Sequence, residues 1–296
     1  MPPITAQEEL SRNSNLKKEN IDYLRDWVSK QPHLPSGVTD EQLILFLNCS
    51  QHSLEACKQT IEAYYTIRTH VEFFKNRNLH SSELQQALSI FEIGLTSKMD
   101  KDGNLIVFGR LIDSDVNKYS CDDTMKTWFM VQDITLLEKG AVHGFIIVFD
   151  TKEFTAGHLT KLKLSSLKNY YMYIQDAFPG VVTCIHFINS SPFTEMFMNI
   201  SKPFLKKNLV EKICIHSTME TLYEYIPKEL LPKEYGGELD SLTHYNKEVR
   251  RLLEEYSDWF QKDEVFRVDE SKRQGRAKNA GDVFGVEGSF KKMDID

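Results

Sequence analysis

The first part of the chain has the hydrophobic period of α-helices. Over residues 20–32, NIDYLRDWVSKQP places three apolar side chains on one helix face, and residues 32–37 then interrupt the run with proline and glycine. Thr39 or Asp40 is a suitable N-cap for the next helix, DEQLILFLNCS. A third helix carries an apolar stripe at Leu54, Cys57, Ile61, Tyr64 and Tyr65. We predict a helical N-terminal unit over residues 1–85.

From residue 98 the pattern changes to one that is typical of β-strands. An Asp-Gly turn at residues 102–103 comes directly before a β-rich run over residues 105–112. Two further apolar strands follow, GFIIVFD and VVTCIHFIN. The three runs predict the strands of one sheet.

Helical patterns separate these strands. They predict an amphipathic helix over residues 124–137 and one long helix over residues 158–178. Continuous apolar strands that alternate with helices are typical of a mainly parallel sheet with both faces buried. We predict an α/β unit over residues 86–244, and a charged helix with a weakly patterned tail over residues 245–296.

Composition and charge describe a globular protein that does not bind nucleic acid. Hydrophobic residues make up 41% of the chain, and the formal net charge is -7 with a pI near 5.8. An acidic balance of this size disfavours general attachment to a phosphate backbone. Charged contacts with a partner are therefore expected to be local.

The sequence predicts a cytoplasmic protein with reduced thiols. The N-terminal segment has no apolar core of the length of a signal peptide, and the longest apolar run, residues 145–149, is far too short to span a membrane. The five cysteines are odd in number and scattered, without a C-x-x-C pair. They lie at Cys49, Cys57, Cys121, Cys184 and Cys214.

Motifs of catalysis and of cofactor binding are absent from the sequence. It contains neither the G-x-G-x-x-G nor the GxxxxGK[ST] phosphate loop, and neither H-E-x-x-H nor G-x-S-x-G. His186 and His216 lie within apolar strands, where histidines with satisfied core hydrogen bonds are the commoner case. We therefore predict no enzymatic activity, no cofactor and no metal site.

Short acidic pairs were the other candidates for metal binding. Asp113 with Asp115, and Asp122 with Asp123, lie near polar loops. Such pairs are usually solvated or cap helices, and a metal ion needs more converging ligands. They do not change the prediction.

The α/β unit is rich in large apolar side chains. Aromatic residues mostly fill protein interiors, so composition alone favours core packing over a cavity. The aromatic residues of this unit include Trp128, Phe129, Phe145, Phe149, Tyr170, Tyr171, Tyr173, Phe178, Phe187, Phe193, Phe197 and Phe204.

Four segments of the chain resemble the CRAL-TRIO family of retinaldehyde-binding and α-tocopherol transfer proteins. They are GFIIVFD, DAFPGVVTCIHFINS, SKPFL and LLPKEYGGEL, in the order and spacing of that family. FGVEGSFKK, near the end of the chain, is similar to the tails of invertebrate members. The resemblance implies an α/β fold in which a sheet forms the floor of an apolar cavity and a mobile helix forms its gate.

The resemblance also implies which residues line the cavity. Period-two alternation independently places Phe145 and Phe149 on the same face of their strand. The implied ligand-binding residues are Met125, Trp128, Phe145, Phe149, Tyr173, Ile174, Phe178, Val182, Ile185 and Leu205.

The implied gate is the helix over residues 193–205. Phe193, Phe197, Ile200 and Phe204 recur there at helical spacing, so they are suited to cover a cavity or to insert among lipid chains. Without the flanking family segments the same stripe would be read as an ordinary core helix. With them, the gate is the favoured interpretation.

Basic residues that would face a membrane follow the gate. Lys212 matches a phosphoinositide-contacting position of the tocopherol transfer protein, and Lys206 and Lys207 lie nearby to attract anionic headgroups. Three other such positions hold Gln59, Thr183 and Asn208 in place of arginine or lysine. Trp128 and Gln132 replace small polar positions of that protein, so the resemblance does not imply tocopherol itself.

We interpret the chain as a monomeric carrier of a small hydrophobic ligand, such as a retinoid, a tocopherol-like compound or a phospholipid. It would exchange this ligand in transient contact with membranes, including anionic ones. The alternative is a regulatory module whose cavity is constitutively filled and whose charged tail helix binds a protein partner. A nucleotide-dependent oxidoreductase is disfavoured because its phosphate loop is absent.

Overall fold

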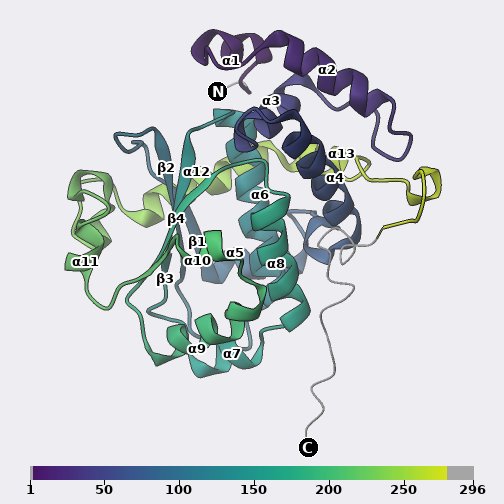
Figure 1. The fold of residues 1–296 in the computed structure, drawn as a ribbon. Coiled ribbons are helices and arrows are strands. Elements are labelled where there is room, and N and C mark those ends of the chain that lie inside the picture. The colour runs from purple at the N-terminus through teal and green to yellow at the C-terminus, as the bar shows by residue number, and fades with distance from the viewer. Residues whose placement is uncertain (1–2, 279–296) are drawn as a thin grey trace, which may run out of the picture.

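The computed structural model describes residues 3–278, in which a five-stranded sheet has helices on both faces (Figure 1). The FGVEGSFKK segment lies outside the described residues. No helix within residues 3–278 has the length and apolar character needed to cross a bilayer.

Helices alone form the N-terminal part of the described chain. Thr39 is the N-cap that the sequence predicts: its hydroxyl accepts from the amide of Gln42, and the Gln42 side chain accepts from the amide of Thr39 at 3.0 Å. Helix α4 packs against α8 of the α/β part, so the two parts share one core. The helices are α1 (Ala6–Arg12), α2 (Lys18–Ser29), α3 (Asp40–Cys49), α4 (Leu54–His70), η1 (Glu72–Phe74) and α5 (Ser82–Ile90).

The sheet confirms the predicted α/β fold class. Its strands follow the order β1-β2-β3-β4-β5; β1 is antiparallel to β2, and all other neighbours are parallel. In the turn before β2, Gly103 has a φ of +81° and the Asp100 carboxylate accepts from the amides of Asp102 and Asn104. The strands are β1 (Phe91–Leu95), β2 (Asn104–Leu111), β3 (Gly144–Asp150), β4 (Val182–Ile188) and β5 (Ile213–Ile215).

Strand β1 is an element that the sequence pattern did not predict. It has only five residues and begins directly after α5, so no turn residue separates it from the helix. Its position depends on distant parts of the chain: β2 pairs with one edge, and Leu242 of α12 packs on Gly94. A Cβ at Gly94 would lie 2.4 Å from that leucine, so this glycine permits the close approach.

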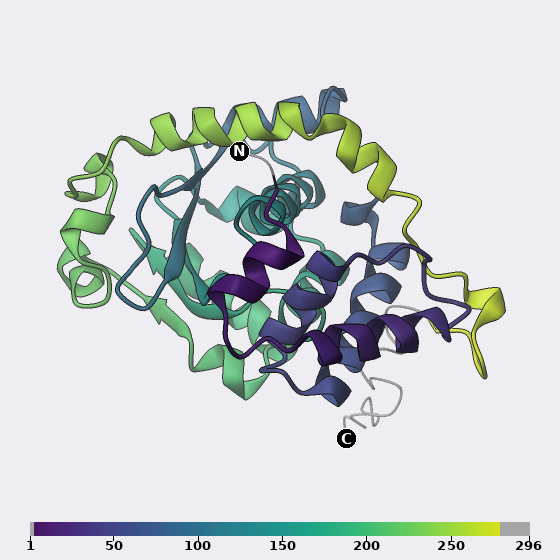
Figure 2. The ribbon, with the colours of Figure 1, turned by 90° about the horizontal axis from the view of Figure 1, so that it is seen from above.

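Different helices cover the two faces of the sheet. On one face, α6 (Cys121–Lys139) and α8 (Leu164–Asp176) pack against the Phe145 side of β3. On the opposite face, the core is completed by α11 (Met219–Tyr223), η3 (Lys228–Leu230), η4 (Lys233–Tyr235) and the start of α12 (Leu242–Glu255). Figure 2 shows α12 running along the molecule, with α13 (Ser257–Asp263) after it. A short helix, η5 (Glu270–Lys272), follows.

Two helices that the sequence predicts as continuous are interrupted. The predicted helix over residues 158–178 consists of α7 (Ala156–Thr160) and α8, because Lys163 adopts an extended conformation between them. The change of direction lets α7 contact α9 while α8 packs on α4 and α6. The helix of the tail is likewise divided at Tyr256 into α12 and α13.

A buried cluster of four charges joins the N-terminal part to α6 and α13. Arg68 donates to Asp133 at 2.8 and 3.0 Å and to Asp263 at 2.9 Å. Arg77 donates to the same two carboxylates. Both arginines are 1% exposed, so each guanidinium depends on these partners for its hydrogen bonds.

The segment predicted as a gate forms α9 (Pro192–Ser201) and η2 (Lys202–Phe204), followed by α10 (Lys207–Val210). Pro192 is the first residue of α9, where its fixed φ suits a helix and its missing N–H costs nothing. Helix α9 lies beside α7 at the bottom of Figure 1.

Candidate functional site

An apolar cavity of about 160 Å³ lies beside the carboxyl ends of the parallel strands. Its floor comes from β2 to β5, its walls from α6 and α8, and its cover from α9 and the loop before α7. Nearly all of its lining is aromatic or aliphatic. The lining residues include Gly109, Leu111, Met125, Trp128, Phe149, Phe154, Leu162, Tyr170, Tyr171, Ile185, Phe187, Thr194, Phe197 and Ile213.

A row of aromatic rings crosses the cavity from α6 to α9. Trp128 lies 4.9 Å from Phe149, which lies 5.6 Å from Phe187 on the neighbouring strand. Phe197 of α9 lies 6.1 Å from Phe187 and 5.9 Å from Phe154. These centroid distances are those of favourable ring contacts, so the row holds α9 against the sheet through apolar contacts.

Glycine at position 109 makes room for this arrangement. A Cβ there would lie 3.0 Å from the ring of Phe91 and 3.1 Å from that of Phe149. A glycine inside a strand often marks such a close approach. This glycine was the available sequence signal for a large ring over β2, and the sequence analysis did not use it.

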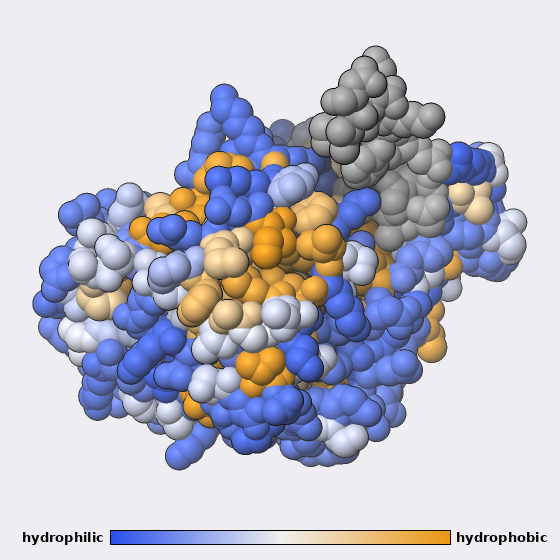
Figure 3. Space-filling model, turned by 90° about the horizontal axis from the view of Figure 1, so that it is seen from below, coloured by the Kyte–Doolittle hydropathy of each residue, from blue (hydrophilic) through white to orange (hydrophobic). Residues whose placement is uncertain are grey.

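Helix α9 contacts the loop after β3 through a buried polar residue. The fully buried Thr194 has its hydroxyl 2.9 Å from that of Thr151, whereas Ser201, also fully buried, donates within the helix to the carbonyl of Phe197. The four predicted gate residues, Phe193, Phe197, Ile200 and Phe204, are all half-buried. Met196 on the outer side is 51% exposed. Figure 3 shows apolar side chains gathered on the side of the molecule where α7 and α9 lie.

Apart from Asp150 at its edge, the described lining of the cavity has no acidic or basic side chain. Burial raises the pKa of Tyr171 to about 12 and raises that of Tyr170 further, so both phenols stay protonated. Asp150 lies at the cavity edge, but its carboxylate accepts from Asn189 and from the hydroxyl of Tyr235. The site therefore favours an uncharged, mostly apolar molecule.

Two polar atoms in the wall lack a hydrogen-bond partner among the described residues. They are Nε1 of Trp128 and Oγ1 of Thr124, and both are buried. A buried donor without a partner costs about 1–3 kcal/mol. These atoms are therefore candidates to contact a polar group of a ligand.

The structure brings together some of the ligand-binding residues that the resemblance implies. Met125, Trp128, Phe149, Ile185 and the gate residue Phe197 line the cavity. The lining does not include Phe145, Tyr173, Ile174, Phe178, Val182 and Leu205. For both groups, contact with a ligand stays a prediction.

Position along the strands and contacts in the core explain why Phe145 and Tyr173 lie outside the cavity lining. Phe145 is the second residue of β3, about 13 Å from Phe149 at 3.3 Å per residue, and packs on Phe178 at 5.6 Å. Tyr173 packs on Phe74 at 4.6 Å and on Phe129 at 4.9 Å. These rings fill the core next to the cavity.

The three predicted membrane-facing lysines have different surroundings. Lys206 is exposed and pairs with Asp176, and Lys207 is exposed with its ammonium 3.8 Å from Glu211. Lys212 is half-buried and donates to the carbonyl of Val182 at 2.6 Å. Membrane contact by these residues stays a prediction.

The acidic pairs at Asp113 and Asp122 form ion pairs. Asp113 accepts from Lys118 at 2.6 Å, and Asp122 accepts from Lys163 at 2.5 Å. Neither pair belongs to a group of potential metal ligands within the described part of the chain.

A mainly parallel sheet with an apolar cavity under a short amphipathic helix defines a binding protein for apolar molecules. Residues 92–237 match the CRAL/TRIO domain, and residues 13–84 match the Pinta-like UBA domain. The chain belongs to the CRAL-TRIO family of lipid-binding proteins, which confirms the resemblance seen in the sequence.

Characterised relatives and one solved structure are similar to the chain over most of its length. Clavesin-2 from Homo sapiens is 28% identical over 242 residues, which are 79% of this chain and 73% of the relative. Clavesin-1 from Mus musculus is 26% identical over 238 residues, or 79% and 67% of the two chains. The crystal structure of Sfh5 covers 80% of this chain and 96% of its own, with a TM-score of 0.45 and 14% identity.

Proposed function

We propose that this protein carries one small hydrophobic molecule in the cavity and exchanges it at a membrane surface by outward movement of α9. The observation that carries the proposal is the aromatic cavity, which is closed on one side by a helix whose apolar stripe is only half-buried. Pockets of this kind usually bind small molecules through apolar contact and a few polar groups.

The size of the cavity supports a moving cover. Ligand pockets usually measure about 300–1,000 Å³, whereas this cavity measures about 160 Å³. A retinoid, a tocopherol-like compound or a phospholipid chain therefore requires the cavity to expand. Among helices, α9 packs mainly on α7 and η2, so we infer that it is the cover that moves at least cost.

The polar atoms of the wall narrow the ligand class. A molecule with one hydrogen-bond acceptor, such as a carbonyl or hydroxyl oxygen, would satisfy the N–H of Trp128. The described wall has one charged group, the Asp150 carboxylate at its edge, which already accepts from Asn189 and Tyr235, so a ligand whose buried end is ionised is disfavoured. We infer an elongated apolar molecule with a neutral polar group that lies near α6.

The alternative role as a protein-interaction module receives less support. The tail helix that would contact a partner buries Leu242, Tyr245, Val249 and Leu253 inside the chain. Its apolar face is therefore occupied by β1 and α6. Only a charged face is left for a partner.

Replacing Phe197 by aspartate tests the role of α9. A carboxylate on the half-buried stripe is costly to place in a bilayer, so ligand loss to vesicles should slow at least tenfold. Protein loaded with its co-purified ligand is mixed with acceptor vesicles that contain phosphatidylserine, and the loaded fraction is followed by native mass spectrometry. High salt should slow transfer less than the variant does, because screening weakens only the lysine contribution.

Val265→Asp is the matched control, since Val265 is 77% exposed and lies outside the cavity lining. It should transfer ligand at the parent rate. Equal rates for Phe197→Asp and the parent, with intact folding and loading, would remove α9 from the exchange mechanism.

A further inference from the structure

The sheet face opposite the cavity carries a cluster of thiols and imidazoles on β4 and β5. Strand side chains alternate, and Ile185, Phe187 and Ile213 line the cavity. The residues between and beside them therefore point to the other face. They are Cys184 and His186 on β4, Cys214 on β5 and His216 directly after β5, so the chain has one Cys-x-His sequence at each of the two strands.

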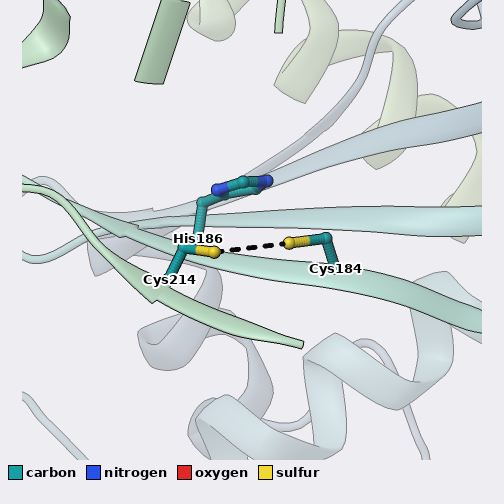
Figure 4. A group of neighbouring side chains, drawn as sticks. All are labelled: Cys184, His186 and Cys214. Atoms are coloured by element: carbon teal, nitrogen blue, oxygen red, sulfur yellow. Dashed lines mark hydrogen bonds between the residues drawn. The ribbon is translucent and has the colours of Figure 1, made fainter. Parts of the chain in front are cut away.

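Parallel pairing of the strands brings these side chains together. In the register of β4 and β5, His186 lies opposite Cys214. The two sulfurs and a ring nitrogen of His186 all lie within 4.8 Å of one another. Figure 4 shows the imidazole of His186 beside the two sulfur atoms. These cysteines are scattered along the sequence, because strand pairing and not chain spacing makes them neighbours.

The distance between the sulfurs fits a shared metal ion. Sγ of Cys184 lies 3.9 Å from Sγ of Cys214. Two thiolates on one tetrahedral zinc ion, each about 2.3 Å from the metal, lie about 3.8 Å apart. A disulfide requires about 2.05 Å, so the sulfurs would have to approach each other by almost half of their separation.

A chain of hydrogen bonds orients the imidazole of His186. Thr221 donates its hydroxyl proton to the carbonyl of Thr218, so it accepts from Nδ1 of His216 at 2.9 Å. Nε2 of His216 is then an acceptor, and Nδ1–H of His186 donates to it at 2.9 Å. This order leaves the lone pair on Nε2 of His186, the nitrogen that is free to bind a metal.

This is the pattern in which metal-binding histidines are held. The second ring nitrogen of such a histidine usually donates to a neighbouring acceptor, which fixes the tautomer and the ring orientation. His216 fills that role for His186. The ring of Tyr225 lies 5.2 Å from that of His186 and 5.6 Å from that of His216, and it is 56% exposed. Both cysteines are half-buried, so an ion can reach them from solvent.

We propose that Cys184, His186 and Cys214 form a binding site for one thiophilic cation of the Zn²⁺ class. Thiolate and imidazole ligands select zinc over the hard cations magnesium and calcium. The two thiol protons leave to solvent on binding, and the fourth coordination position stays open to water. A bound ion would tie the three-residue strand β5 to β4, directly after the segment that contains α9. The site is separate from the cavity and does not depend on the proposed carrier function.

Titration of the reduced, full-length protein with Co²⁺ and then Zn²⁺ tests the site. Co²⁺ should give the near-ultraviolet thiolate charge-transfer band and the visible bands of a four-coordinate site. One equivalent of Zn²⁺ should abolish these bands and raise the melting temperature. The variants Cys184→Ser and Cys214→Ser should each bind Zn²⁺ at least about 100-fold more weakly than the parent, as measured by competition with a chelator.

Two further variants separate a metal site from a structural cluster. Cys49→Ser changes a half-buried thiol of α3 outside this cluster and should bind Zn²⁺ like the parent. His216→Ala should keep the cobalt thiolate band but weaken Zn²⁺ binding about 10–100-fold, because it removes only the group that orients His186. Absence of the cobalt band in the folded parent, or unchanged Zn²⁺ affinity in Cys184→Ser, would overturn the proposal. A disulfide between Cys184 and Cys214 in protein isolated under reducing conditions would also overturn it.

Discussion

At the scale of single residues, the wall of the cavity combines large apolar contact with very few polar atoms. Alternation along β3 is enough to predict which side chains share a face of the sheet, and it places Phe149 and Phe145 on the same face. It does not predict how far along the strand the cavity lies. That depth depends on where α9 covers the strand ends, so Phe149 lines the cavity while Phe145 packs in the core.

Trp128→Phe tests the inferred polar contact with the ligand. It keeps an aromatic ring but removes a buried N–H that has no partner among the described residues. A lost hydrogen bond of about 0.5–1.5 kcal/mol should speed ligand dissociation about twofold to thirteenfold. In the ligand-free protein the Trp128 N–H has no hydrogen-bond partner among the described residues. The variant should therefore not lower the unfolding free energy of the ligand-free protein by the cost of a hydrogen bond.

Trp27→Phe is the control for Trp128→Phe, since Trp27 lies on α2 away from the cavity lining. Dissociation is measured as the loss of co-purified ligand to apolar beads. If Trp128→Phe and the parent lose ligand at the same rate, the N–H of Trp128 does not contact the ligand.

At the scale of helices and strands, the sequence predicts most elements but not their interruptions. The apolar stripe over residues 158–178 is compatible with one helix, and nothing local requires the chain to leave it at Lys163. The interruption lets α7 pack against α9, so it depends on tertiary contacts and not on the local sequence. Strand β1 was missed for the same reason, because its partners are β2 and α12.

The buried charges show how distant elements are joined. Burial raises the pKa of Asp263, but the charges of Arg68 and Arg77 outweigh it and lower the pKa below its usual value. The unfolded chain therefore binds more protons than the folded one at acid pH. The stabilisation that the Asp263 carboxylate gives the folded state is present above pH 4, and it is lost as the pH falls through the lowered pKa of Asp263.

Asp263→Asn should lower the unfolding free energy at pH 7 by about 3–5 kcal/mol, because two buried arginines lose a charged partner. Its unfolding free energy should also depend less on pH below pH 4 than that of the parent. Urea unfolding followed by circular dichroism at several pH values measures both effects. Asp258→Asn, at an exposed position of the same helix, should change little. Equal stability of Asp263→Asn and the parent would show that α13 is not anchored by this cluster.

At the scale of the whole molecule, the sheet separates two chemically different faces. One face carries the apolar cavity and α9, and the opposite face of β4 and β5 carries the thiols and imidazoles. The resemblance of four sequence segments to the CRAL-TRIO family was sufficient to predict the fold class and the family. The thiol and imidazole cluster was not predictable from spacing, because it depends on the register between two parallel strands.

The proposed carrier function requires that the cavity holds a small apolar molecule. Native mass spectrometry of the purified full-length protein, followed by organic extraction, measures this directly. The parent should show one bound small molecule per chain, and Phe149→Glu should fold but bind none, because its carboxylate would lie in the apolar floor. A parent without an extractable apolar ligand, or a folded Phe149→Glu variant with unchanged occupancy, would contradict the account.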